Sequence, residues 1–205
     1  MNLRSRPLVV VGVIVAALGN AVLNYLDHVL NLPLFFDSFF TAIGAAVYGW
    51  GPGLAIAILS QVAIQASLVV AENMVWGMAL PFVLCQIETA LVIGFMVRFG
   101  SFRSIPSLII AVFAVALGNS VIGSLVATFV FGGITLHGAD FLVAGLIMGG
   151  QNLLEASFWA RVPINLVDKG IAVVAAYLVL QRWGAATGLP IRIPSMERSS
   201  SSDSQ

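Results

Sequence analysis

Long apolar segments dominate the chain, separated by short stretches that contain glycine, proline or charged residues. A helix rises about 1.5 Å per residue, so about 20 apolar residues are needed to cross the hydrocarbon core of a bilayer. The second apolar segment is the shortest, and the apolar loop before it, residues 27–37, is expected to pack in the outer mouth of the bundle. The pattern predicts six membrane-spanning helices, at residues 7–27, 36–50, 52–71, 78–99, 105–131 and 162–183.

The composition excludes a water-soluble domain. Of the 205 residues, 60% are hydrophobic and only 9% are charged, and the mean hydropathy is +1.03. A soluble domain of this size would expose a largely uncharged surface and aggregate. The predicted fold class is therefore an all-α integral membrane protein that crosses the cell membrane several times. We expect one membrane domain over residues 1–190 and a disordered cytoplasmic tail over 191–205, where serine replaces the apolar pattern.

The first apolar segment follows Arg4 and Arg6 and therefore imitates a cleavable signal peptide. Its sequence ALGN, at residues 17–20, recurs at residues 116–119, deep inside the chain. A discarded peptide has no reason to share a repeat with the mature protein. We therefore interpret this segment as a retained first helix.

The distribution of Arg and Lys predicts the orientation and the number of spans. With six spans and a cytoplasmic N-terminus, seven basic residues lie inside and two outside, in agreement with the positive-inside rule. A seventh span at 140–158 would divide them four to five. We therefore predict cytoplasmic termini and an interfacial or partly inserted helix at 140–158. The inner residues are Arg4, Arg6, Arg98, Arg103, Arg182, Arg192 and Arg198, and the outer ones are Arg161 and Lys169.

Acidic residues fall on or near the outer side, with one exception. Glu88 lies ten residues before Arg98, about 15 Å along a helix, which places it near the middle of the bilayer. A carboxyl group at that depth needs to be protonated or hydrogen-bonded. Glu88 is therefore a candidate for ligand binding, and a neutral carboxyl that bonds a neighbouring helix is the alternative.

The stretch RVPINLVDKG, residues 161–170, brings Arg161, Asp168 and Lys169 close together in an otherwise apolar chain. Adjacent helix residues point about 100° apart, so Asp168 and Lys169 are each expected to have a separate partner. The charges either contact a ligand directly or tie the last helix to loop residues such as Glu155 and Asp140. The sequence leaves both interpretations open.

Buried amide side chains form a second group of candidates. Gln61 and Gln65 are one turn apart and share a helix face. Amides inside a membrane protein serve more often as bonds between helices than as ligand contacts. The same two interpretations apply to Asn20, Asn24, Asn119 and Asn165.

Small residues recur at four-residue spacing in the first predicted helix. Gly12, Ala16 and Asn20 form one row, and Ala17 and Ala21 form another beside it. Such rows give a flat face on which a second helix can approach closely. The second helix can belong to this chain or to a partner protein.

Several functions are disfavoured by what the sequence lacks. The single Cys85 excludes an internal disulfide, and His28 and His137 are too few and too far apart in sequence to favour a metal site. No phosphate-binding loop, H-E-x-x-H or G-x-S-x-G motif is present, so we expect neither an enzyme nor an intrinsic ATPase. The net charge of zero gives no basic stripe for nucleic acid, and no cofactor is expected.

Two motifs resemble one family of membrane proteins. The run LFFDSFFTAIGAAVYGWGPGLAIAILSQ, residues 34–61, is similar to a recurring segment of the substrate-binding S components of energy-coupling factor (ECF) transporters. PINLVDKGIAVVAAYLV, residues 163–179, resembles the opening of their final helix. The resemblance implies a compact six-helix subunit with cytoplasmic termini that imports a vitamin or a similar micronutrient.

The resemblance also implies a division of roles. The ligand would bind in the outer half, near Asp37, Glu88, Asn165, Asp168 and Lys169, and an A-x-x-x-A face on the first helix would dock a transmembrane coupling subunit that carries two ATPases. Asn2 stands where the cobalt and nickel S components have histidine, which disfavours metal uptake. Residues 12, 16, 17 and 21 are the partner-docking candidates, and the substrate-binding candidates are Asp37, Gln61, Gln65, Glu88, Asn119, Asn165, Asp168 and Lys169.

Two other functions remain open. A membrane-embedded ligand sensor would need a separate output partner, because only about 20 residues follow the last predicted helix. A solitary proton-coupled carrier would use Glu88 as its proton site.

Overall fold

The computed structural model describes residues 6–100, 102 and 104–183. The expected tail at 191–205 lies outside the described residues. The described chain forms helices and connecting loops, without a strand. The elements are α1 (Arg6–Leu30), α2 (Phe39–Tyr48), α3 (Trp50–Glu72), the 3₁₀ turn η2 (Leu80–Phe82), α4 (Val83–Arg98), α5 (Ile105–Phe129), α6 (Asp140–Met148) and α7 (Leu153–Trp183).

Helix length confirms an all-α protein that crosses a membrane several times. Among the described residues, five segments are long and apolar enough to span: α1, α3, η2 with α4, α5 and α7. The span predicted at 36–50 is only partly formed, because α2 has ten residues. Ten residues make about 15 Å of helix, which is half the thickness of the hydrocarbon core. Gly49 ends α2 with φ +92°, a conformation that favours glycine.

The prediction of a single helix at 140–158 is wrong, because these residues are divided between two helices. α6 ends at Met148, and the chain turns through Gly149 and Gly150, the latter with φ +93°. Asn152 then begins α7, since its Oδ1 accepts a hydrogen bond from the backbone N–H of Glu155 at 2.9 Å. Residues 153–158 therefore belong to the last helix.

The last helix also begins earlier than the predicted residue 162. That start was predicted from the boundary of the apolar segment, which is marked by Arg161 and Pro163. In the structure α7 is a 31-residue helix with Pro163 inside it. Arg161 consequently lies within the helix rather than in the loop before it.

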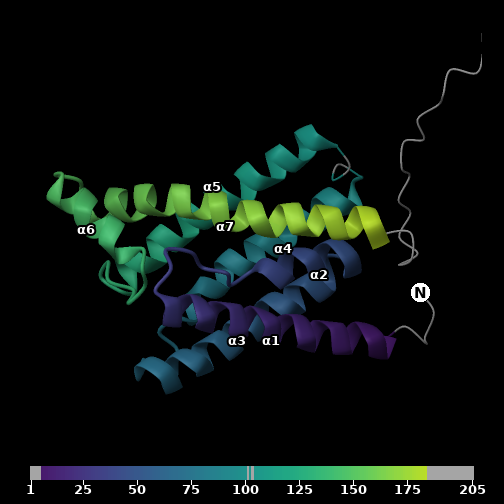
Figure 1. Ribbon diagram of the computed structural model, residues 1–205, viewed down its shortest axis with the longest axis horizontal. Helices are drawn as coiled ribbons and strands as arrows, with labels where there is room; N and C mark the ends of the chain where they lie inside the picture. The colour runs from purple at the N-terminus through teal and green to yellow at the C-terminus, as the bar shows by residue number, and fades with distance from the viewer. Residues whose placement is uncertain (1–5, 101, 103, 184–205) are drawn as a thin grey trace, which may run out of the picture.

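The first helix begins and the last helix ends on the same side of the bundle. The first turn of α1 and the last turn of α7 lie at the same end, and α6 lies at the opposite end beside the start of α7 (Figure 1). We refer to the latter as the α6 end. The arrangement places the loops at 31–38 and 130–139 together at the α6 end.

Small residues allow the helices to pack closely in the main apolar core. Ala45 of α2, Ala90 of α4, Ala116 of α5 and Ala176 of α7 are fully buried. Gly53 of α3 lies against Ala45, so close that a Cβ at Gly53 would come within 2.9 Å of the Ala45 Cα. Such close approach is how membrane helices gain dispersion energy without a hydrophobic driving force.

The small-residue rows of α1 face other helices of the same chain. A Cβ at Gly12 would meet the Tyr48 hydroxyl, Ala17 is only 4% exposed, and Ala21 packs against the cluster around Ile64. Ala16 is partly exposed. Ala17 is therefore an internal packing position, whereas Gly12 and Ala16 are only partly buried.

Buried amides tie the helices together. Asn20 donates to Thr41 Oγ1 and to Ser60 Oγ, each at 2.9 Å, and its Oδ1 accepts from the Phe40 N–H at 2.8 Å. One side chain thus joins α1, α2 and α3. In a bilayer this matters because no water is available to satisfy such groups.

The close α2–α3 contact yields a prediction. Gly53→Leu should lower the free energy of unfolding by about 1–3 kcal/mol, because the new side chain has to displace the backbone of Ala45. Thermal unfolding of the purified protein in detergent measures the loss. Gly51→Leu is the matched control, since no atom lies within 4 Å of a Cβ at Gly51. Equal melting temperatures for the two variants would contradict this packing.

Candidate functional site

A cavity of about 80 Å³ opens among the helices at the α6 end. Helices α1, α3, α4, α5 and α7 and the two loops at that end contribute to its wall. One part of the lining is apolar and includes Ile64, Leu68, Met74, Phe82 and Phe131. The polar part includes Asn24, Gln61, Asn119, Thr135, Arg161 and Asn165.

Helix α7 supplies a row of polar side chains at four-residue spacing. Arg161, Asn165 and Lys169 line the cavity and are all buried. Residues four apart lie on one face of a helix, one above the other. The row exists because α7 continues through Pro163, which puts Arg161 on the same face as Asn165.

Lys169 is the centre of a buried charge cluster. It is 1% exposed, and its Nζ lies 2.5 Å from Asp37 Oδ1, 2.7 Å from Asp168 Oδ2 and 2.9 Å from Ser38 Oγ. A buried ammonium group is tolerated only with such partners. The cluster fastens α7 to the loop before α2.

Asp168 has a partner of its own in the same loop. Its Oδ1 accepts a hydrogen bond from the Phe36 N–H at 3.0 Å. Phe36 has φ +45°, a strained conformation for a bulky residue, which the carboxylate stabilises. Asp168 and Lys169 therefore have separate partners as expected, and they also contact each other, which was not expected.

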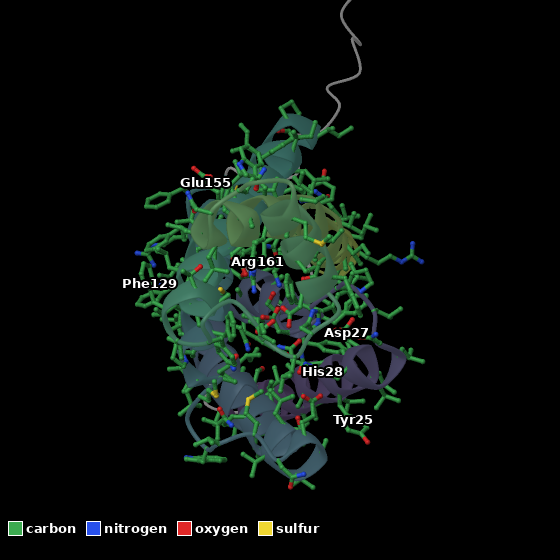
Figure 2. The ribbon with its side chains drawn as sticks, turned by 90° about the vertical axis from the view of Figure 1, so that its left-hand side faces the viewer. Tyr25, Asp27, His28, Phe129, Glu155 and Arg161 are labelled. Atoms are coloured by element: carbon green, nitrogen blue, oxygen red, sulfur yellow. The ribbon has the colours of Figure 1, made fainter. Side chains whose placement is uncertain are left out.

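Arg161 is a buried cation with few partners in the described part of the chain. It is 2% exposed, and its guanidinium makes one hydrogen bond, from Nη1 to the Ser157 carbonyl at 3.2 Å. Within the described residues, Arg161 forms no salt bridge with an acidic side chain. Figure 2 shows Arg161 pointing into the middle of the bundle and Glu155, on the same helix, at its edge. Arg161 therefore does not tie α7 to Glu155.

The two histidines come together although they are far apart in sequence. His137 lies 2.7 Å from Asp27 Oδ2, and its Nδ1 accepts from the Ala139 N–H at 3.2 Å, so Nε2 carries the proton that Asp27 accepts. His28 lies 2.7 Å from Glu72. The His137 ring stacks on Phe35 at 4.9 Å between centroids. No group of three metal-ligating side chains occurs in the described residues.

Residues 31–38 and 130–139, which we call the roof loops, cover the cavity. Asp140 organises the second loop, because it accepts from the Thr135 N–H and hydroxyl, both at 2.8 Å. Gly138 packs so tightly on the first loop that a Cβ there would lie 2.7 Å from the Leu32 oxygen. Together with the His137–Asp27 pair, these contacts join the roof loops to each other and to α1.

The glutamines of α3 hold the segment that leads into α4. Gln61 donates to the Ala79 carbonyl at 2.8 Å, and Gln65 accepts from the Ala79 N–H at 2.7 Å. Gln86 donates to Gln61 at 2.7 Å. Gln61 lines the cavity, whereas Gln65 lies behind it.

Glu88 does not reach the cavity. Its Oε2 accepts from Asn119 Nδ2 at 2.6 Å, and a Cβ at Gly118 would touch it, so the carboxyl group lies between α4 and α5. Of its two interpretations, the geometry matches a carboxyl group that bonds a neighbouring helix. Asn119 itself contacts the cavity with another part of its side chain.

The structure brings five of the eight expected substrate-binding residues to the cavity: Asp37, Gln61, Asn119, Asn165 and Lys169. Gln65, Glu88 and Asp168 stand behind the wall. Arg161 was not among these eight residues, because its charge was left open between a ligand contact and a tie to a loop. Its spacing of four from Asn165 places it on the cavity face once the helix is extended. His28 and His137 were not among the eight either, because no local pattern marks them as site residues.

Comparisons of the chain with protein-family models, with curated proteins and with solved structures found no match.

The Lys169 cluster yields a prediction. Lys169→Gln should destabilise the protein by about 3–5 kcal/mol, because it leaves Asp37 and Asp168 buried without their cation. Denaturant unfolding in detergent measures the change. The double variant Asp37→Asn with Lys169→Gln should recover part of the loss.

Glu155→Gln is the control for this measurement, because it removes an exposed charge from the same helix. If Lys169→Gln is no more destabilising than Glu155→Gln, the cluster does not hold α7 to the first roof loop.

Proposed function

We propose that the protein is the substrate-binding membrane subunit of an ECF-type importer of a vitamin or a similar small micronutrient. The observation that carries the proposal is the cavity at the α6 end, which is lined by Arg161, a buried arginine that forms no salt bridge with an acidic side chain among the described residues. Charged side chains inside a membrane protein are costly and mark ligand or ion sites. The two motifs at 34–61 and 163–179 support the same family.

The composition of the cavity suits a small organic solute. Charged groups lie on α7 and in the first roof loop, and amides lie on α1, α3, α5 and α7. Aromatic and aliphatic groups from α3 and from the segments around Phe82 and Phe131 complete the lining. Small-molecule sites combine a mostly apolar wall with a few fixed polar groups in this way. An ion-selective pore would need polar groups along the whole bundle, whereas the core near Ala45 and Val173 is apolar.

The orientation follows from charge. In the predicted six-span topology, seven basic residues lie on the side of the chain termini and two on the other side, so the positive-inside rule supports cytoplasmic termini and an outward-facing cavity. The roof loops would then control entry from outside.

Coupling to energy requires other chains. The sequence has no phosphate-binding loop, so a transmembrane coupling subunit and two ATPases would supply ATP hydrolysis. The docking surface for the coupling subunit would not include Ala17, since its side chain is buried inside the bundle.

The test is gentle purification of the full chain from its native host, followed by mass spectrometry of proteins and small molecules. We expect a multi-pass coupling subunit and two ATPases in stoichiometric amounts. Recovery with a kinase-like partner would indicate a sensor instead. Recovery of the chain alone, with uptake that needs no ATPase, would contradict the proposal in favour of a solitary carrier.

Glu88 separates the importer from the proton-coupled carrier. Glu88→Gln should leave solute uptake within about twofold of the wild type, because a glutamine oxygen can accept the same bond from Asn119. Uptake of labelled solute into cells measures this. A carrier that uses Glu88 as its proton site would lose uptake, and with it sensitivity to the proton gradient.

A further inference from the structure

We propose that the cavity selects a small carboxylate-bearing molecule, whose acid group is bound by the guanidinium of Arg161. The inference rests on the proposed function, because it names the substrate class of the same site. It applies whichever energy source drives uptake.

Most hydrogen-bond donors of the Arg161 guanidinium have no partner among the described residues. A guanidinium has five N–H donors and is charged at any physiological pH. Within the described residues its one hydrogen bond goes to the Ser157 carbonyl, a neutral acceptor on its own helix. Arg161 lines the cavity, and a planar oxyanion bound there can accept two of the remaining donors at once.

Packing against α5 holds the Arg161 side chain in place. Its side-chain stem lies against α5 at Gly123, where a Cβ would come within 3.3 Å of the Arg161 Cδ and 3.8 Å of the Cys85 sulfur. The absence of a side chain at Gly123 leaves room for the stem. The charge is thus positioned by packing before a ligand arrives, which reduces the entropy lost on binding.

A second unpartnered group lies on the α1 side of the cavity. Asn24 is 6% exposed, its Nδ2 donates to the Phe35 carbonyl at 2.9 Å, and its Oδ1 has no partner. Because the amide donates to a carbonyl, the free atom is the oxygen. In Figure 2 α1 lies across the bundle end from Arg161. A ligand that also donates a hydrogen bond would satisfy both groups.

Charge favours a carboxylate over a phosphate. Of the two cations at the cavity, Lys169 is already shared by Asp37 and Asp168, which leaves the single positive charge of Arg161. A carboxylate carries one negative charge and neutralises it. A phosphate ester would bring a second negative charge into a site that Asp37 also lines.

Size and lining define the rest of the ligand. A volume of about 80 Å³ has room for a compact molecule, several times the ~10–15 Å³ that one water needs by the same kind of measure. Phe82 and Phe131 lie 5.5 Å apart between ring centroids in the apolar wall. A single ring or a short apolar body fits beside them.

The experiment uses three probes that differ only in the group presented to Arg161: benzoate, benzamide and phenyl phosphate. Isothermal titration calorimetry measures their binding to the purified full chain in detergent. We expect benzoate to bind at least tenfold more tightly than the other two, because only benzoate offers a single oxyanion.

Variants then assign the selectivity to Arg161. Arg161→Gln should weaken benzoate binding at least tenfold and leave benzamide binding unchanged, so that the preference for the acid disappears; Arg161→Lys should give an intermediate loss. Arg182→Gln, at an exposed position of the same helix, is the matched control and should keep the preference. Thermal unfolding shows whether each variant is folded.

Three results would overturn the inference. They are equal affinities for benzoate and benzamide, a benzoate preference that survives in Arg161→Gln, and tighter binding of phenyl phosphate than of benzoate. Failure of the folded wild type to bind any probe would overturn it as well. The proposed function is judged separately by the co-purifying subunits, so the two can fail independently.

Discussion

The burial of the Lys169 ammonium group is the constraint on which the α6 end of the molecule depends. In a bilayer no water compensates a buried charge, so the ammonium has to find its partners within the protein. It finds Asp37 and Ser38 in the first roof loop and Asp168 on its own helix. Since Asp168 also binds the backbone of Phe36, the loop is fixed at two points over the cavity. The buried charge of Lys169 therefore holds the first roof loop over the cavity.

The same helix face that carries Lys169 gives the cavity its chemistry. Positions at four-residue spacing present Asn165 and Arg161 to the same space. Asn165 is satisfied by Ser120 of α5 at 3.0 Å, and Lys169 is satisfied by the cluster, whereas Arg161 has a single neutral partner. Satisfied polar groups build the walls of this cavity, and the unsatisfied group supplies its selectivity.

Much of the fold could be predicted from apolar periodicity, and the failures have physical causes. Five long helices lie where the hydrophobic segments predict them, because a bilayer demands such lengths. The start of α7 was missed because the usual penalty for Pro163 does not break this helix, and Arg161 was lost as a site residue with it. The pairing of His137 with Asp27 spans 110 positions, and no local pattern encodes so distant a contact. Glu88 was recognised as buried, but which side of α4 faces the cavity depends on packing.

Binding of a small solute at the α6 end is the central proposal. An experimental structure of the protein purified gently from its host tests it most directly. We expect the density of a compact molecule beneath the roof loops, in contact with the Arg161 guanidinium and bounded by Phe82 and Phe131. A structure in which Arg161 pairs with a carboxylate of the protein, and side chains fill the space between α1 and α7, would contradict the claim.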